Sequence, residues 1–137
     1  MAPVNFLSIF IAAISSMVVG SIWYGPLFGK IFMREMGMDK WPPEKQAAMK
    51  KKMWLSYLGQ FVGSFVMFFF MAGFIVGFGQ TTLKGGLWVA FTVWLGFIMP
   101  VILGELLWGG TKTMFWLKAG NMFFTLLVAG AILGAWA

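Results

Sequence analysis

The sequence contains no cysteine and no histidine, and it has few charged residues. Asp, Glu, Lys and Arg together make up 10% of its 137 residues. Without Cys and His, the chain cannot form disulfides, thiol nucleophiles or Cys/His metal sites, and it lacks the usual side chain for proton transfer near neutral pH. A protein without Cys can function in an oxidising or a reducing compartment, so the absence of Cys does not indicate where this protein is located.

Hydrophobic residues dominate the chain instead. They make up 61% of it, whereas soluble domains contain about 45 to 50%. A soluble domain of this length leaves a large share of its surface in water and could not hide so many apolar side chains. The composition therefore predicts an integral membrane protein, with a single domain over residues 1–137.

Four long segments of the chain are almost free of charge. They predict membrane spans at about 4–24, 54–78, 85–105 and 118–136, because about 20 apolar residues cross a hydrocarbon core of about 30 Å. The fold class that follows is all-α, an integral membrane four-helix bundle. For the first segment a cleaved signal peptide is the alternative, although a basic start and a small-residue cleavage site are missing.

Prolines mark where the predicted helices begin and bend. Pro42 and Pro43, followed by Glu44, predict a helix that begins in water before the second span. Pro100 has no N–H to donate to the preceding turn, so we expect it to bend the third span.

Lysine and arginine are distributed unevenly between the spans. Seven lie between the first and second spans and two between the third and fourth, whereas Lys84 is alone between the second and third. Cytoplasmic loops carry the excess of Lys and Arg, so the pattern predicts a cytoplasmic loop at 30–52 and both termini outside. We expect the protein in the cytoplasmic (inner) membrane of a bacterium or archaeon. Four residues at span ends are expected to anchor in the membrane interface: Trp23, Tyr24, Lys30 and Trp54.

Glycines recur at helical spacing on two of the spans. In lipid, small residues stabilise helix pairs because they let the two backbones approach closely. We therefore predict helix packing at six glycines: Gly59, Gly63, Gly73 and Gly77 on one face of the second span, and Gly130 and Gly134 on the fourth. The partner is either another span of the same chain or a second protein, and the spacing fits both.

Polar side chains within the spans are few, and those of most interest lie toward the inner leaflet. Gln60, Glu105 and Asn121 form a candidate polar site there. An ionisable residue inside a span is costly, about 2.5 to 3.5 kcal/mol at the bilayer centre. Glu105 lies 21 residues beyond Lys84, so it reaches the inner boundary. It either pairs there with Lys112 or Lys118, or turns inward toward Gln60 and Asn121.

No motif in the chain indicates catalysis. The nucleophile elbow G-x-S-x-G, the zinc motif HExxH and the phosphate-binding GxxxxGK[ST] are missing, so we expect no enzyme, no cofactor and no metal site. The basic loop is short and tied to the membrane, so we expect it to set topology and to bind no nucleic acid. It could also lie along the lipid headgroups as a short amphipathic helix at about 28–36.

Two stretches of the sequence resemble a known family. The first is the block GSIWYGPLFGK from Gly20 to Lys30, followed by Met33 and Met36-Gly37, and the second is the ending GAILGAW from Gly130 to Trp136. Both are similar to the opening and closing signatures of small four-span membrane proteins grouped as domain of unknown function 1761. Phe32 stands where that pattern has a tryptophan. The resemblance implies the four-span fold over nearly the whole chain and implies no activity.

Two functions from different classes follow from these features. The leading one is a helix-packing, oligomerising or accessory subunit of a membrane assembly, formed with further copies or other membrane proteins through the glycine-lined faces. The alternative is a small oligomeric transporter or channel whose inner-leaflet polar site contains Gln60, Glu105 and Asn121. The lipid bilayer is a partner in both.

Overall fold

The computed structural model describes residues 4–137, and within that range it contains only helices and their connections. In chain order these are α1 (Phe6–Ile22), the π-helical turn η1 (Trp23–Leu27), α2 (Gly29–Glu35), the 3-10 turn η2 (Met38–Lys40), α3 (Pro43–Gly77), α4 (Leu83–Val93), the π-helical turn η3 (Trp94–Ile98), α5 (Met99–Leu107) and α6 (Lys112–Ala135). The prediction of an all-α fold is confirmed. The predicted outer position of the N-terminus involves residues 1–3, which lie outside the described range.

Four helical segments of the described chain are long and apolar enough to cross a membrane. They are Phe6–Leu27, Pro43–Gly77, Leu83–Leu107 and Lys112–Ala135, in agreement with the four spans expected. The second begins at Pro43, as the prolines predict, and continues as one helix of 35 residues. The fourth helix begins at Lys112, earlier than the predicted start of its span at residue 118.

Each π-helical turn contains a proline or lies just before one. Pro26 is inside η1, and Pro100 is the second residue of α5, directly after η3. Proline has no N–H to donate, and its ring clashes with the carbonyl four residues earlier, so a helix around it has to widen or bend. The irregularity predicted at Pro100 is therefore present as a widened turn, and the first span has a second one at Pro26.

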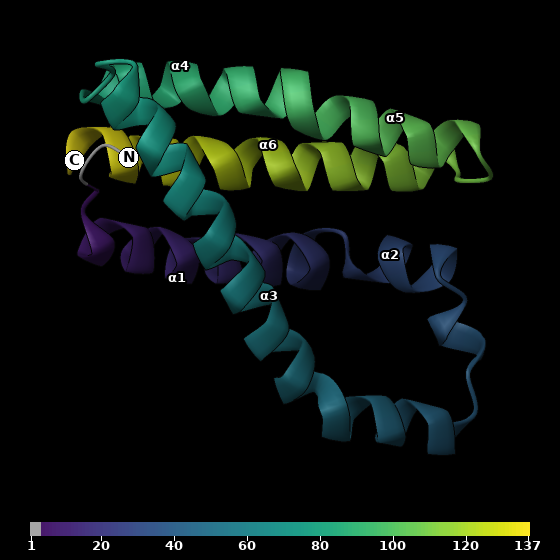
Figure 1. The fold of residues 1–137 in the computed structure, drawn as a ribbon. Helices are drawn as coiled ribbons and strands as arrows, with labels where there is room; N and C mark the ends of the chain where they lie inside the picture. The colour runs from purple at the N-terminus through teal and green to yellow at the C-terminus, as the bar shows by residue number, and fades with distance from the viewer. Residues whose placement is uncertain (1–3) are drawn as a thin grey trace.

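The helices form a layer of three with the fourth laid across it. α1, α6 and the segment from α4 to α5 lie side by side with α6 in the middle, and α3 crosses them diagonally (Figure 1). All buried residues of α3 are in its second half: Ser64, Phe68, Met71, Ala72 and Ile75. Residues 47–60, in its first half, are all exposed. One half of α3 is thus packed on the layer while the other diverges from it.

α4 and α6 approach each other closely at three glycines. Gly86 of α4 lies against the backbone of Gly130, and a Cβ on Gly134 would come to 2.7 Å from the Cα of Gly86. A Cβ on Gly130 would lie 2.7 Å from the Cβ of Ala90. The two glycines predicted on the fourth span therefore pack against α4. Gly86 completes the contact, although it belongs to no GxxxG unit in the sequence.

The glycines of α3 are placed differently. A Cβ on Gly59, Gly63 or Gly77 would meet open space, and Gly73 is only partly buried. For Gly59, Gly63 and Gly77, the expectation of packing within one chain is therefore wrong. Their contact with a second copy or another protein stays a prediction.

Candidate binding cavity

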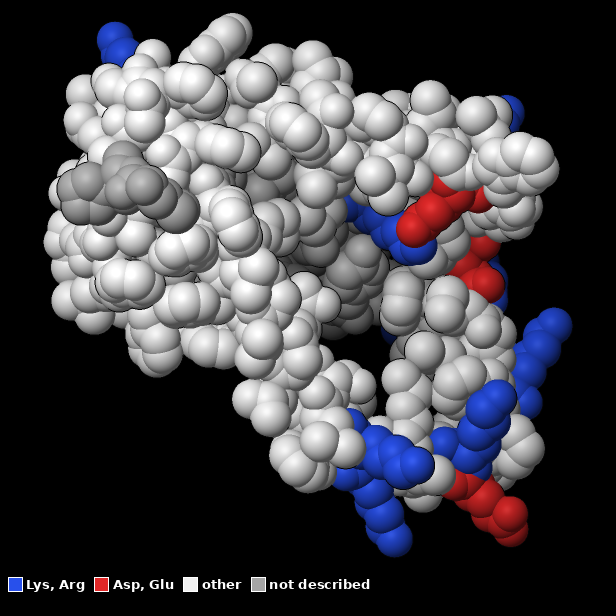
Figure 2. Space-filling model, in the orientation of Figure 1, with Lys and Arg blue, Asp and Glu red and all other residues white. Residues whose placement is uncertain are grey.

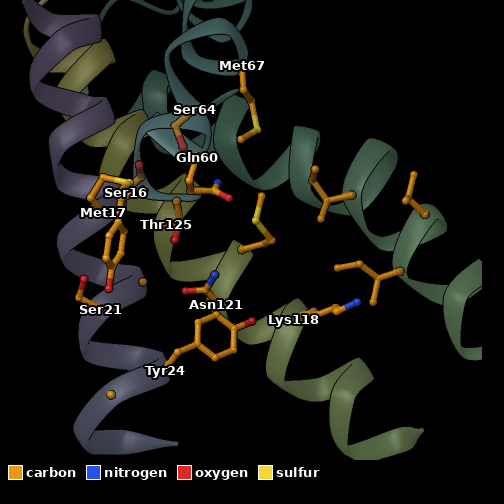
Figure 3. Close-up of a pocket in the computed structure, with 17 residues that line it drawn as sticks. Ser16, Met17, Ser21, Tyr24, Gln60, Ser64, Met67, Lys118, Asn121 and Thr125 are labelled. Atoms are coloured by element: carbon orange, nitrogen blue, oxygen red, sulfur yellow. The ribbon is translucent and has the colours of Figure 1, made fainter. Parts of the chain in front are cut away.

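A cavity of about 610 Å³ lies between α1, α3, α5 and α6, on the side where α3 diverges from the layer. Its polar wall consists of hydroxyl, amide and ammonium groups from three helices: Ser16, Ser21 and Tyr24 from the first span, Tyr57, Gln60 and Ser64 from α3, and Lys118, Asn121 and Thr125 from α6. Figure 3 shows polar side chains from all three helices directed into one space. The remaining wall is apolar, with Ile98, Val101 and Ile102 on one side and three methionines between the polar groups.

Regular spacing along each helix brings the polar residues to one face. Tyr57, Gln60 and Ser64 on α3 follow the positions i, i+3 and i+7, and Lys118, Asn121 and Thr125 on α6 follow the same pattern. Residues at these intervals share a helix face. This repeated triplet is the signal in the sequence that could have located the whole cavity.

The two predicted amides meet in this cavity, whereas the predicted carboxylate does not. Gln60 and Asn121 both line it, but Glu105 is not among the lining residues. Its carboxylate Oε2 instead accepts a hydrogen bond of 2.7 Å from the ammonium of Lys118. Of the two arrangements expected for Glu105, the pair with a boundary lysine is therefore the one present, and the inward position is wrong.

The ion pair lies at the edge of the cavity and is open to solvent. The side chains of Lys118 and Glu105 are 40% and 52% exposed. Figure 2 shows a hollow in this face of the molecule, with basic and acidic atoms side by side at its edge. Lys118 is the one charged lining residue in the described part of the chain, so the pair leaves the cavity with no net charge.

Two polar groups of α6 in the cavity wall have no hydrogen-bond partner. Thr125 is 5% exposed, and its Oγ1 is unpaired, as is the Oδ1 of Asn121. A hydroxyl in a helix usually donates to a carbonyl of the preceding turn, as the hydroxyl of Ser16 does to Ala13 over 2.6 Å. Thr125 makes no such bond, and a buried polar group left unpaired costs about 1 to 3 kcal/mol. Thr125 Oγ1 and Asn121 Oδ1 therefore lie just beneath the cavity surface with hydrogen-bonding capacity that the protein itself leaves unused.

Both π-helical turns contribute to the cavity. Tyr24 and Gly25 come from η1, and Ile98 comes from η3. A π turn shifts the residues after it around the helix axis, and such turns recur at functional sites. The two prolines therefore do more than bend the spans, since the widened turns that contain or precede them contribute residues to the same cavity.

The four predicted interface anchors occupy different environments. Trp54 is 63% exposed on the first half of α3, and Lys30 is exposed on α2, so both positions suit an interface. Tyr24 lines the cavity. Trp23 packs its ring against Phe124 of α6, and its indole N–H is buried without a partner. Gly120 makes room for this ring, because a Cβ there would come to 2.6 Å from it. Trp23 is thus packed on α6, and its role as an interface anchor stays a prediction.

Searches of the curated proteins and of the solved structures found no match to this chain. The comparison with family models did find one, and it covers residues 7–134. That range includes all four candidate spans almost completely, together with the cavity. The chain therefore belongs to the family described as Protein of unknown function (DUF1761).

Proposed function

We propose that this protein takes up a small polar or amphipathic molecule in the cavity at the inner side of the membrane, as the binding step of a carrier. The observation that carries the proposal is the unpaired pair Thr125 Oγ1 and Asn121 Oδ1 in the wall of a cavity of about 610 Å³. Ligand sites typically measure about 300 to 1,000 Å³ and combine apolar walls with a few convergent polar groups. Of the two functions that the sequence suggests, this favours the transporter.

The position of the cavity supports a one-sided opening. It lies beneath the free half of α3, at the end of the molecule where most charged side chains gather (Figures 1 and 2). By the positive-inside rule this end faces the cytoplasm. At the other end of α3, Phe68, Met71 and Ile75 are buried against the layer. A cavity open at one end and sealed at the other is the arrangement expected of a carrier in one of its two states.

The test is the chemical accessibility of the cavity. Since the chain has no cysteine, a single introduced thiol can be labelled without background. Gly20 lines the cavity, and a Cβ there meets open space. Val18, on the same helix, is 53% exposed and does not line it. We expect Gly20→Cys, and not Val18→Cys, to react with a charged methanethiosulfonate in inverted membrane vesicles, because a thiol in lipid does not ionise.

Two outcomes of this labelling would overturn the proposal. One is that Gly20→Cys stays unreactive in inverted vesicles while a permeant, uncharged maleimide modifies it after the membrane is dissolved in detergent. The other is that Gly20→Cys and Val18→Cys react at the same rate, which would mean that the cavity offers no more water than the lipid-facing surface. Labelling of Gly20→Cys only in right-side-out vesicles would reverse the proposed topology.

A second function, an oligomer formed through α3, is favoured by a separate observation. Residues 47–60 of α3 are exposed on every face, and the exposure continues along one side to Val62 and Gly63. Trp54, Leu58 and Val62 are exposed at more than half of their surface, and Gly59 and Gly63 lie between them. Leu at position 63 would block close approach of a second helix to this face. If the free half makes the contact, Gly63→Leu converts an oligomer to a monomer in native mass spectrometry. Gly104→Leu is the control, because a Cβ on Gly104 also meets open space, and it should leave the mass of the oligomer unchanged.

A further inference from the structure

We infer that the ligand of this cavity is an uncharged amphiphile with a hydroxyl-bearing head, such as a glyceryl or other polyol group on an acyl chain. The inference rests on the proposed function and names the chemical class of its ligand. Three properties of the cavity lead to it: its charge balance, the kind of hydrogen-bonding groups it presents and the place where its apolar wall meets the lipid.

The charge balance disfavours an ion. Lys118 is the one charged group in the wall among the described residues, and Glu105 already holds its ammonium at 2.7 Å. An anionic head would have to share the ammonium of Lys118 with Glu105, whose like charge repels it, and a cationic head would find no carboxylate inside the cavity. Since an unpaired charge is costly in a site of low polarity, an uncharged head fits best.

The hydrogen-bonding groups match hydroxyls. Eight of the nine polar lining residues carry either a hydroxyl or an amide, and both kinds of group donate as well as accept. Within this wall Thr125 Oγ1 and Asn121 Oδ1 are unpaired and lie one helical turn apart on α6. Both atoms lie beneath the cavity surface, so a head with two neighbouring hydroxyls can donate to Asn121 and exchange a hydrogen bond with Thr125 once these two side chains turn toward it. A purely apolar ligand would leave both groups unpaired.

The apolar wall leads from the cavity to the lipid-facing surface. Ile102 of α5 is 6% exposed, whereas Val101 beside it is 65% exposed, and both line the cavity. On the opposite wall Tyr57 of α3 also lines the cavity and is 50% exposed. The cavity is therefore open sideways between α3 and α5, where an acyl chain can pass from the head into the bilayer.

The experiment measures how well defined lipids protect the thiol of Gly20→Cys in lipid nanodiscs. The probes are 1-monooleoylglycerol, its phosphorylated counterpart 1-oleoyl-lysophosphatidic acid, which has the same chain and glycerol, and free glycerol, which has the hydroxyls without the chain. We expect monooleoylglycerol to slow modification by the charged methanethiosulfonate about tenfold at about ten times its Kd. We expect the other two probes to change the rate less than about twofold at matched concentrations.

Each alternative outcome overturns a defined part of the inference. Equal or better protection by the phosphorylated lipid would make the ligand an anion. Equal protection by glycerol would make it a free polyol from the water phase. Reactivity that no probe changes would mean that the cavity holds water only, with the proposed accessibility intact. No labelling at all would instead refute the proposed function.

A second measurement does not depend on the thiol. Monooleoylglycerol should raise the Tm of the cysteine-free protein in detergent, and Thr125→Val, which removes the hydroxyl at nearly constant volume, should abolish this rise. A rise of equal size in Thr125→Val would overturn the assignment of the head to the α6 wall. Leu126→Val, at the neighbouring core position, is the matched control and should keep the ligand-induced rise.

Discussion

The ammonium of Lys118 lies 2.7 Å from the carboxylate of Glu105, and only the lysine of the two lines the cavity. The carboxylate of Glu105 therefore neutralises the positive charge that Lys118 brings to the cavity, while Glu105 itself stays outside the cavity wall. Because both side chains are substantially exposed, the pair contributes little to stability, about 0 to 1 kcal/mol. Its effect is on which ligands the cavity accepts.

Replacing Glu105 should change the charge preference of the cavity. In Glu105→Gln the ammonium of Lys118 loses its partner, so the phosphorylated lipid should protect the thiol of Gly20→Cys at least about fivefold better than in the parent protein. The labelling rate in nanodiscs measures this effect. Glu35→Gln, which removes a carboxylate bonded to Thr111 outside the cavity wall, is the control and should change nothing. Loss of protection by monooleoylglycerol in Glu105→Gln would mean that Glu105 itself holds the ligand.

Removing the unpaired hydroxyl of Thr125 should stabilise the protein when no ligand is present. The Oγ1 is buried without a partner, and Val has nearly the same shape, so Thr125→Val should raise the free energy of unfolding by about 1 kcal/mol. Thermal unfolding in detergent free of added lipid is the measurement. A lower Tm for Thr125→Val would show that the hydroxyl is already paired in the folded protein, against the basis of the ligand proposal.

Filling the cavity should abolish binding without harming the fold. Gly20 lines the cavity with open space at its Cβ, so Gly20→Leu places a side chain where the ligand would sit. Replacing a helical glycine also favours the helix by about 0.5 to 1 kcal/mol. We expect an unchanged or higher Tm and no further rise with monooleoylglycerol.

The control for this variant is a helical glycine that also has open space at its Cβ but does not line the cavity. Gly104 of α5 also meets open space and does not line it, so Gly104→Leu should keep the full response to the lipid. An intact response in Gly20→Leu would place the ligand elsewhere.

A methyl group at Gly86 should disrupt the contact between α4 and α6. A Cβ there would overlap the carbonyl of Gly130, which is backbone and cannot move aside as a flexible side chain could. Overpacking costs about 1 to 3 kcal/mol, so Gly86→Ala should lower the Tm clearly, while Gly104→Ala should not. Fluorescence-detected size exclusion after heating compares the two variants. Equal stability would show that α4 and α6 are farther apart than described.

The sequence predicts the spans well because lipid sets a simple requirement of length and apolarity. It also predicts where α3 begins, since Pro43 suits only a first helical turn. Gln60 and Asn121, two of the three residues of the predicted polar site, line one cavity because both lie toward one end of their helices and the i, i+3, i+7 pattern fixes the face. The pairing of Glu105 with Lys118 was one of two open choices.

The sequence does not predict which face of α3 packs. In water the apolar face of a helix is the buried one, but in lipid every apolar face is equally well solvated, so hydrophobicity does not distinguish them. The glycine rule pointed to Gly59 and Gly63, whereas the packed face carries Ser64, Phe68 and Ile75. Gly86 was missed for a related reason. It forms a small-xxx-small pair with Ala90, and a search for GxxxG units alone does not include that pair.

The 35 residues of α3 form one unbroken rod that is clamped at a single end. If α3 tilts as a rigid body, the pivot lies near Ser64, where its buried residues begin. Since Lys50 lies 14 residues from Ser64, or about 21 Å along the axis, a tilt of about 10° at the pivot displaces it by about 4 Å. A ligand that tilted α3 at this point would therefore move the three consecutive lysines from Lys50 to Lys52 farther than the residues that line the cavity.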